Sequence, residues 1–295
     1  MRITITGGSG RIGATLVERL RARGDDVTLL SRSPGKGTEW HPEREPAPAS
    51  ALAGRDAVIH LAGEDVAQRW DDDAKRRIRD SRVLGTRNLV LGLEQVPEGA
   101  RPRVLVSGSA SGYYGDRGDE PVDESAAPGT DFLARVCVDW EAEAVRAEAL
   151  GLRVVRLRTG VVLDKDGGAL AKMLPFFRAG VGGPVAGGRQ QMPWIHLDDE
   201  VGLILAALDG PDWSGPVNGA APAPVDNRTF SRALGRALHR PAFAPVPAFA
   251  VKLLYGEMAA IVTGGVRMVP ARAQELGYAF AHPALDEALR DALGR

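Results

Sequence analysis

Cysteine, excess charge and long apolar runs are scarce in this chain of 295 residues. Its one cysteine, Cys137, excludes an internal disulfide and argues against a cysteine-based metal site, so we expect no metal. Lys plus Arg number 37 and Asp plus Glu number 38, which leaves a formal net charge of -1 and no basic excess for nucleic acid. No apolar stretch is long enough to span a membrane. Composition therefore predicts a globular, cytoplasmic protein with neither a nucleic-acid nor a membrane partner.

Strand and helix patterns alternate over the first half of the chain. Short apolar runs predict strands at residues 3–6, 27–30, 57–61, 104–107 and 152–157. The first of these is too short for the core of a signal peptide. Helical spacing predicts helices at residues 11–23, 72–93 and 131–150. Residues 33–48 are rich in Pro and Gly and indicate an exposed connection. The alternation predicts an α/β fold, a Rossmann-type doubly wound parallel sheet.

The pattern changes after Leu163. Glycines crowd residues 167–188, a strand and a helix are expected within residues 192–209, and Pro is frequent from residue 222 onward. We therefore expect a nucleotide-binding domain at residues 1–165. Residues 166–295 would return to the sheet and then form a smaller C-terminal lobe. Such a lobe would cover the carboxyl ends of the strands, where open α/β sheets bind their substrates.

A glycine-rich turn joins the first strand to the first helix. The sequence Thr6-Gly7-Gly8-Ser9-Gly10-Arg11-Ile12-Gly13 contains G-x-x-G-x-x-G. Gly7 allows the tight turn, Gly10 lets the backbone approach a pyrophosphate, and Gly13 lets the helix pack on the strand. Arg11 and Ile12 open a helix whose free N–H groups attract phosphates. Because the motif lies between a clear strand and a clear helix, we favour dinucleotide binding over a plain turn.

The end of the second strand predicts which dinucleotide is preferred. NAD sites usually place Asp or Glu here to hold the ribose hydroxyls, whereas this chain has Ser31 and Arg32. A guanidinium can pair with a 2′-phosphate and a serine hydroxyl can donate to it. The alternative is that Arg32 is a solvated loop residue. We expect NADP as the cofactor, with NAD less favoured.

Matching segments spread over most of the chain resemble the extended short-chain dehydrogenase/reductases, the group that contains nucleotide-sugar epimerases and dehydratases. Besides the glycine turn, they are His60-Leu61-Ala62-Gly63, Gly85-Thr86-Arg87-Asn88-Leu89, Ser107 to Gly115, Leu157 to Leu163, and Trp194 to Asp199. Arg69-Trp70, Ser81-Arg82, Gly167-Gly168-Ala169-Leu170 and Leu238-His239-Arg240-Pro241 are similar to an atypical, epimerase-like subfamily, often labelled nucleoside-diphosphate-sugar epimerase or cell-division-inhibitor-like. Its members carry a C-terminal domain of unknown function, which would start here near Pro245.

The resemblance implies where several residues lie relative to the cofactor. Leu61, Ala62 and Gly63 would pass beneath the adenosine and pyrophosphate. Ser107 and Ser109 would lie beside the nicotinamide, and Val161 would touch it. Arg82 stands where relatives commonly have Asn, so it would either reach the cofactor phosphates or pair with Asp80 or Glu64.

The catalytic pattern of the family is incomplete here. The family uses a Tyr as acid/base, a Lys that lowers the pKa of that Tyr, and a Ser that orients the substrate. Ser109 fits the serine position, but no Tyr-x-x-x-Lys pair is present. An alignment on Glu141 places Leu133 and Cys137 at the two positions, and a shift by one residue places Phe132 and Val136 there. None of these is a usual proton donor.

Other side chains are weighed as substitutes for the missing donor. Tyr113 and Tyr114 follow Ser109 in a Gly-flanked loop, and we keep Ser109 and Tyr113 as the catalytic candidates. Packing is the alternative role for either tyrosine. His196 before Asp198 resembles a general-base arrangement, although this segment is equally typical of a helix N-cap.

Two functions remain open from the sequence. One is an NADP(H)-binding epimerase or oxidoreductase that acts on an unknown small polar substrate. The alternative is a catalytically silent NADP(H)-binding regulatory or scaffold protein, with a link to cell division. A homodimer through helices 70–93 and 131–150, as in relatives, is also left open.

Overall fold

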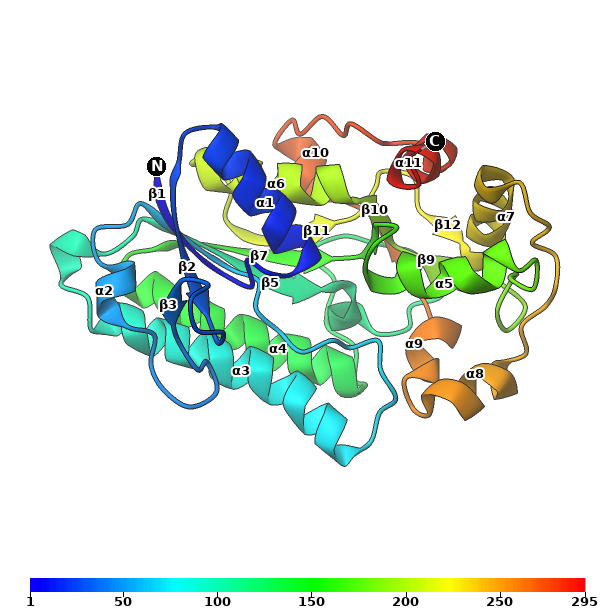
Figure 1. Ribbon diagram of the computed structural model, residues 1–295, viewed down its shortest axis with the longest axis horizontal. Helices are drawn as coiled ribbons and strands as arrows, with labels where there is room; N and C mark the ends of the chain where they lie inside the picture. The colour runs from blue at the N-terminus through cyan, green and yellow to red at the C-terminus, as the bar shows by residue number, and fades with distance from the viewer. Residues whose placement is uncertain (295) are drawn as a thin grey trace.

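A seven-stranded parallel sheet forms the centre of the molecule (Figure 1). The structure is a computed structural model that describes residues 1–294. In spatial order the strands are β11 (Gly215–Gly219), β7 (Arg153–Thr159), β5 (Val104–Ala110), β4 (Ala57–His60), β1 (Arg2–Thr6), β2 (Asp26–Ser31) and β3 (Thr38–Glu39). The strand order reverses direction between β1 and β4, and ligands of such sheets bind at that switch point.

Helices cover both faces of the sheet (Figure 1). α1 (Arg11–Ala22) and α6 (Leu197–Asp209) pack on one face, whereas α3 (Asp72–Glu94) and α4 (Phe132–Val145) pack on the other. Alternate strand residues separate the two cores. Ile5, Ile59 and Val106 join the core beneath α1 and α6, while Val58 and Leu105 join the core beneath α3 and α4. Strands buried on both faces explain the continuous apolar runs of the sequence. The predicted Rossmann-type fold is confirmed.

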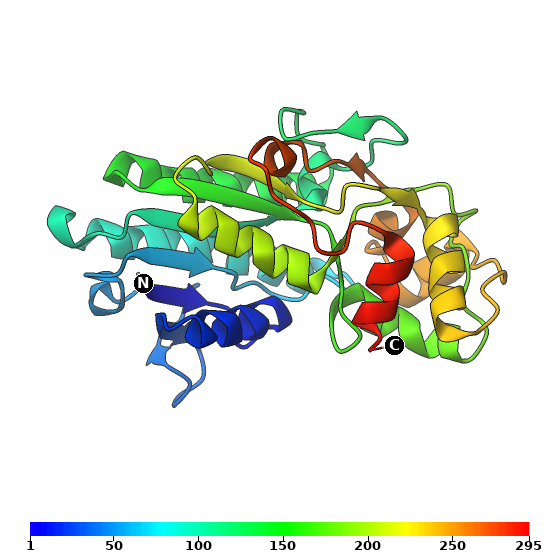
Figure 2. The same cartoon turned by 90° about the horizontal axis from the view of Figure 1, so that it is seen from above.

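The remaining elements build a lobe at the end of the sheet toward which the strands run, as Figure 2 shows. The lobe helices are α5 (Gly168–Arg178), α7 (Asn227–Leu238), α8 (Ala248–Tyr255), α9 (Ala259–Thr263) and α11 (Leu285–Ala292). Two short helices, α2 (Ala49–Leu52) and α10 (Ala271–Glu275), lie along the sheet domain. Three pairs of short strands lie outside the main sheet: β8 (Val161–Leu163) with β10 (Trp194–His196), β9 (Gln191–Met192) with β12 (Val225–Asp226), and β6 (Pro121–Val122) with β13 (Arg267–Met268). α5, α7 and α11 share a core of their own.

Three details differ from the expected elements. The connection at residues 33–48 contains β3, and Trp40 behind it is 2% exposed, because this segment folds back along β2. The helix expected at residues 131–150 ends as α4 at Val145 and continues as a 3₁₀ turn (Arg146–Leu150). β5 extends to Ala110, which places both Ser107 and Ser109 inside the strand.

Among residues 1–294, no helix is long and apolar enough to cross a membrane. The domain boundaries remain predictions.

Candidate functional site

The glycine turn after β1 has room only for glycine at two positions. Gly7 has φ +73°, and a Cβ there would lie 2.6 Å from the carbonyl carbon of Leu61. A Cβ on Gly13 would lie 2.2 Å from the Gly7 oxygen. The Gly10 N–H closes the turn on that oxygen at 3.0 Å. Gly10 precedes α1 without a side-chain cap, so the first-turn N–H groups of α1 are left for a ligand.

A cavity of about 880 Å³ runs from this turn along the end of β2 to the carboxyl end of β4. Seven of the predicted cofactor residues line it: Gly7, Gly10, Ser31, Arg32, Leu61, Ala62 and Gly63. Its size suits part of a dinucleotide, since ligand pockets are commonly about 300–1,000 Å³. The cavity therefore joins the two segments that the sequence assigned to the cofactor.

The cavity lining is cationic at the loop after β2, where Arg32 and Lys36 lie. Among the described residues, the lining also includes Arg21, from the last turn of α1, and no Asp or Glu. The Ser33 N–H donates to Ser31 Oγ at 3.1 Å, which fixes the turn at the end of β2. Sequence reasoning missed Arg21 and Lys36. Lys36 reaches the cavity because the loop after β2 turns back and β3 pairs with β2. This pairing depends on tertiary contacts, so local sequence patterns do not predict it.

Arg11, Ile12 and Gly13 support the turn rather than line the cavity. The Arg11 guanidinium donates to the Asp164 carboxylate at 2.5 and 3.1 Å, and this hydrogen bond raises the pKa of Arg11. Ile12 packs against the core under α1. Arg11 thereby ties the start of α1 to the segment that follows β8.

Arg82 lies at the carboxyl end of β4. Its Nη1 donates to the carbonyl oxygens of Glu64 at 3.0 Å and Ile78 at 3.1 Å. The guanidinium lies 5.3 Å from the Trp140 ring centroid and 3.2 Å from the position of a Cβ on Gly63. Burial lowers its pKa, and the nearby charges of Glu64 and Asp65 oppose that effect. Neither carboxylate that the sequence proposed as a partner, Asp80 or Glu64, makes a hydrogen bond to it among the described residues.

Ser109 is joined to a buried ion pair. It is 4% exposed, and its hydroxyl donates to Glu141 Oε1 at 2.7 Å. Arg158 holds both Glu141 oxygens through Nε at 2.8 Å and Nη2 at 2.9 Å. Burial lowers the pKa of Arg158, but the hydrogen bond and charge of Glu141 outweigh it and raise that pKa overall. The Ser109 proton therefore points at Glu141 in this structure, away from any substrate.

The two tyrosines of the following 3₁₀ turn (Ser111–Tyr114) differ in environment. Tyr114 is fully buried, donates to Asn218 Oδ1 at 2.6 Å and accepts from Arg158 at 2.9 Å. Burial raises the pKa of Tyr114 to about 12, which suits a packing role. The Tyr113 ring lies 3.4 Å from Arg158 Cζ and is only partly buried.

The face of α4 that meets the end of β5 carries no Tyr or Lys among the described residues, and presents Leu133, Cys137 and Glu141 instead. Leu133 packs against Gly112, and Cys137 Sγ lies 3.9 Å from the Ala110 oxygen. Burial raises the pKa of the Cys137 thiol to about 12. Phe132 instead packs on Trp70 with ring centroids 5.3 Å apart. The geometry thus selects the alignment in which Leu133 and Cys137 occupy the catalytic positions.

Three further candidates lie away from the cavity. His196 Nδ1 accepts from the Asp198 N–H at 3.1 Å, so His196 caps α6 rather than Asp198. Ser107 is fully buried and its hydroxyl donates to the Gly108 oxygen at 3.2 Å. The Val161 N–H donates to the Pro193 oxygen at 2.6 Å. These three residues order the carboxyl edge of the sheet.

Comparisons with known proteins agree with this geometry. A model of the NAD dependent epimerase/dehydratase family matches residues 3–218, and a domain of unknown function, DUF1731, matches residues 246–292. The chain is 42% identical over 300 residues to the epimerase family protein SDR39U1 homolog, chloroplastic, of Arabidopsis thaliana, covering 98% of this chain and 86% of that one. It is 37% identical over 297 residues to epimerase family protein SDR39U1 of Homo sapiens, covering 99% of both.

Two solved structures of epimerase-type proteins are also similar to this chain in sequence and fold. The human epimerase family protein SDR39U1 (isoform2), crystallised with NADPH, has a TM-score of 0.88 at 32% identity and full coverage of both chains. The nucleoside-diphosphate sugar epimerase from Corynebacterium glutamicum has a TM-score of 0.80 at 33% identity, covering 100% of this chain and 58% of that one. The resemblance inferred from the motifs is confirmed: the chain belongs to the NAD dependent epimerase/dehydratase family.

Proposed function

We propose that this protein binds NADP(H) in the cavity beside the glycine turn and acts as an oxidoreductase or epimerase on a small polar substrate. One observation carries the proposal: a single cavity joins the glycine turn to a cationic end at the loop after β2, which carries Arg32 and Lys36. The human relative crystallised with NADPH supports it. None of the comparisons favours the catalytically silent alternative. A cytoplasmic location remains part of the proposal.

The cationic end explains a preference for NADP over NAD. The 2′-phosphate adds negative charge where Arg32 and Lys36 lie, and the Ser31 hydroxyl can donate to it. An acid at this position would repel the phosphate, and the cavity lining has none among the described residues.

The bound cofactor would exchange hydride with the substrate, while this chain must handle the proton. Leu133 on α4 cannot do so, burial raises the pKa of the Cys137 thiol, and Glu141 is bonded to Ser109 and Arg158. We therefore propose Tyr113 as the proton donor, because its hydroxyl, unlike that of Tyr114, makes no hydrogen bond to the buried network among the described residues. Ser109 and Glu141 would position the turn that carries it. The substrate would lie between the sheet and the C-terminal lobe.

Cofactor selectivity tests the first half of the proposal. Dissociation constants for NADPH and NADH are measured for the wild type, Arg32→Ala and Lys36→Ala. We expect NADPH to bind more tightly in the wild type, and each substitution to weaken NADPH by about tenfold or more, since a hydrogen bond to a charged group contributes about 1.5–3 kcal/mol. NADH affinity should stay unchanged. Arg103→Ala, at a side chain 87% exposed outside the cavity, is the control. Equal affinity of the wild type for both cofactors would refute the proposal.

Turnover tests the second half. Purified protein and NADPH are mixed with aldehydes, ketones, quinones and nucleotide sugars, and absorbance of the reduced nicotinamide and the product sugars are followed. We expect one of these compounds to be turned over by the wild type. The Tyr113→Phe variant should lose this turnover but still bind NADPH. Tight binding without turnover of any compound would favour the catalytically silent alternative.

A further inference from the structure

Exposed apolar side chains gather in the C-terminal lobe. Seven of the nine large exposed hydrophobic residues of the described chain lie between Phe176 and Ile261, and Phe243, Phe249 and Leu253 are 82%, 74% and 75% exposed. α8 has the sequence AFAVKLLY, yet Val251 is its one buried residue. A helix this apolar usually buries a whole face, whereas α8 buries only Val251 and leaves Phe249, Leu253 and Leu254 exposed.

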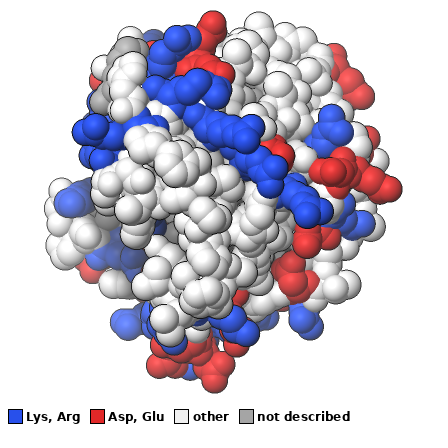
Figure 3. All heavy atoms as spheres, turned by 90° about the vertical axis from the view of Figure 1, so that its right-hand side faces the viewer, with Lys and Arg blue, Asp and Glu red and all other residues white. Residues whose placement is uncertain are grey.

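A band of arginines borders this apolar region. α7 places Arg228, Arg232 and Arg236 at four-residue intervals, which puts them on one helix face. Arg240 follows the end of α7 and lines the same hollow as Arg232 and Arg236. Arg236 pairs with Asp286 at 2.7 Å, and Arg228 donates to the Gly187 oxygen at 2.7 Å. Arg232 and Arg240 have no partner among the described residues. Figure 3, which faces this end of the molecule, shows Lys and Arg in a band across mostly uncharged surface.

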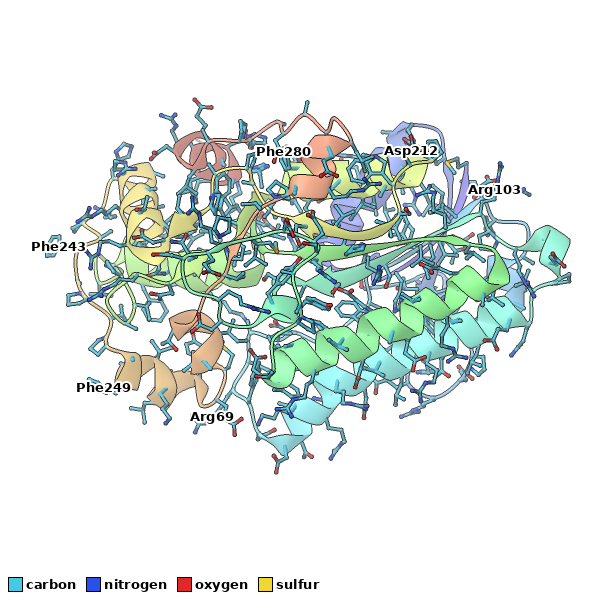
Figure 4. All side chains as sticks on the ribbon, turned by 180° about the vertical axis from the view of Figure 1, so that it is seen from behind. Arg69, Arg103, Asp212, Phe243, Phe249 and Phe280 are labelled. Carbon is cyan, nitrogen blue, oxygen red and sulfur yellow. The ribbon has the colours of Figure 1, made fainter. Side chains whose placement is uncertain are left out.

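Three arginines of the band and one exposed apolar residue border the same hollow. Arg232, Arg236, Arg240 and Phe243 line the same shallow hollow of about 650 Å³. The segment from there to α8 is held against the lobe, because the Val246 N–H donates to the Pro184 oxygen at 2.9 Å. Figure 4 shows Phe243 and Phe249 pointing outward along one end, opposite to Arg103. We name the surface made by Arg232, Arg240, Phe243, Phe249 and Leu253 the lobe tip.

We propose that the lobe tip docks on an anionic lipid bilayer, with Phe249 and Leu253 entering the headgroup region while Arg232 and Arg240 meet lipid phosphates. Side chains that are about three-quarters exposed protrude, and protruding apolar side chains suit a deformable partner better than a rigid one. Cations beside them complement an anionic leaflet. A second copy docked tip to tip would bring two arginine bands together, which charge repulsion opposes.

This inference goes beyond the proposed function and differs from the expectation drawn from composition, which no observation tests. A net charge of -1 over the whole chain suggested no membrane partner, but that average conceals the local band on α7. Docking at the lobe tip would hold the protein at a membrane surface without a spanning segment.

Vesicle co-sedimentation tests the proposal. The full chain is mixed with vesicles of phosphatidylcholine alone or phosphatidylcholine with phosphatidylserine. We expect binding to the anionic vesicles only, weakening as salt is raised. Arg232→Gln with Arg240→Gln should weaken binding about 25-fold, at about fivefold for each charge removed. Phe249→Ser with Leu253→Ser should weaken it by about tenfold or more, and this loss should persist at high salt.

Matched variants away from the tip separate docking from general charge or folding effects. Arg76→Gln with Arg103→Gln removes two exposed charges elsewhere, and Val138→Ser removes an exposed apolar side chain from α4. Both controls should bind vesicles as the wild type does, and all variants should keep NADPH affinity and thermal stability. Failure of the wild type to bind anionic vesicles, or equal loss in the controls, would overturn the proposal.

Two other outcomes would replace the lipid partner. Self-association seen by light scattering, and abolished by Phe249→Ser with Leu253→Ser, would identify a second copy as the occupant. Binding to polyglutamate or RNA at a salt concentration where vesicles do not bind would identify an acidic polymer. Neither outcome bears on cofactor binding, so the proposed function is tested separately.

Discussion

At the scale of single residues, Glu141 of α4 holds together side chains from two neighbouring strands, β5 and β7. It accepts from Ser109, Arg158 and Arg156, and both it and Arg158 are almost fully buried. Glu141 thus supplies the counter-charge for two guanidinium groups, one of them buried. The sequence offered Glu141 merely as an alignment anchor, because nothing local announces that β7 supplies two arginines to it.

Substitution at Glu141 should therefore cost more stability than substitution at Ser109. Glu141→Gln leaves Arg158 buried without its counter-charge, and we expect a loss of about 3–5 kcal/mol in the free energy of unfolding. Ser109→Ala removes one hydrogen bond and should cost about 1 kcal/mol. Urea titrations of the two variants and the wild type measure both. Similar losses for the two variants would show that Glu141 is not the organising residue.

Glu200 gives a pH dependence with a defined sign. It is fully buried, Thr159 donates to its Oε1 at 2.6 Å, and its Oε2 has no partner among the described residues. Burial raises the pKa of Glu200 from 4.5 to about 8. Between these values the unfolded chain has released the proton and the folded chain retains it. Stability therefore falls by about 1.4 kcal/mol for each pH unit as pH rises through this window.

Glu200→Gln removes this titration. The variant should gain stability relative to the wild type as pH rises from about 5 to about 8, by about 3–5 kcal/mol over the whole interval. Urea titrations at both pH values measure the difference, and Glu287→Gln, at an exposed position of α11, serves as the control. A difference between variant and wild type that stays constant with pH would contradict the buried, neutral state of Glu200.

At the scale of elements, the sequence predicted the helices and strands whose apolar residues recur with a regular spacing. β1, α1, β4 and α3 were expected within one or two residues of their bounds, because buried parallel strands and long helices leave regular apolar patterns. β3 is two residues long, and β11 has the sequence GPVNG, so neither leaves an apolar alternation. Their positions depend on pairing with β2 and β7, which local sequence does not encode. The cavity residue Lys36 was missed for the same reason.

The strand–turn–helix unit around Gly13 should be intolerant of a single methyl group. A Cβ on Gly13 would lie 2.2 Å from the Gly7 oxygen and 2.9 Å from the Gly8 Cα, both of them backbone atoms that cannot rotate away. We expect Gly13→Ala to cost about 1–3 kcal/mol of stability and to weaken NADPH binding, because the turn must open. Gly99→Ala, where nothing lies within 4 Å, is the control and should be near neutral. Calorimetry with and without NADPH distinguishes the two. Unchanged NADPH binding by Gly13→Ala would show that the turn does not hold the cofactor.

At the scale of the whole molecule, residues of the C-terminal part of the chain, from Val266 onward, pack in several hydrophobic clusters together with residues from earlier elements. Asp199 at the start of α6 accepts from the Ala281 and His282 N–H groups at 2.7 and 2.9 Å. Met268 packs in a cluster with Tyr114, and Leu289 packs with α5 and α7. The sequence indicated a separate C-terminal lobe here from its change in composition. Packing against the sheet domain could not be anticipated from composition, since it depends on contacts between distant residues.

This interleaving predicts that the lobe and the sheet domain unfold together. Leu289 is fully buried in α11, so Leu289→Ala should lower the free energy of unfolding by about 2–5 kcal/mol. We expect far-UV circular dichroism and bound NADPH fluorescence to be lost in one urea transition, shifted equally for both signals. Arg290→Ala, exposed on the same helix, should leave the transition in place. If Leu289→Ala instead unfolds in two steps, with NADPH still bound after the first, then the C-terminal residues form an independent unit and the shared core contributes little to cooperativity.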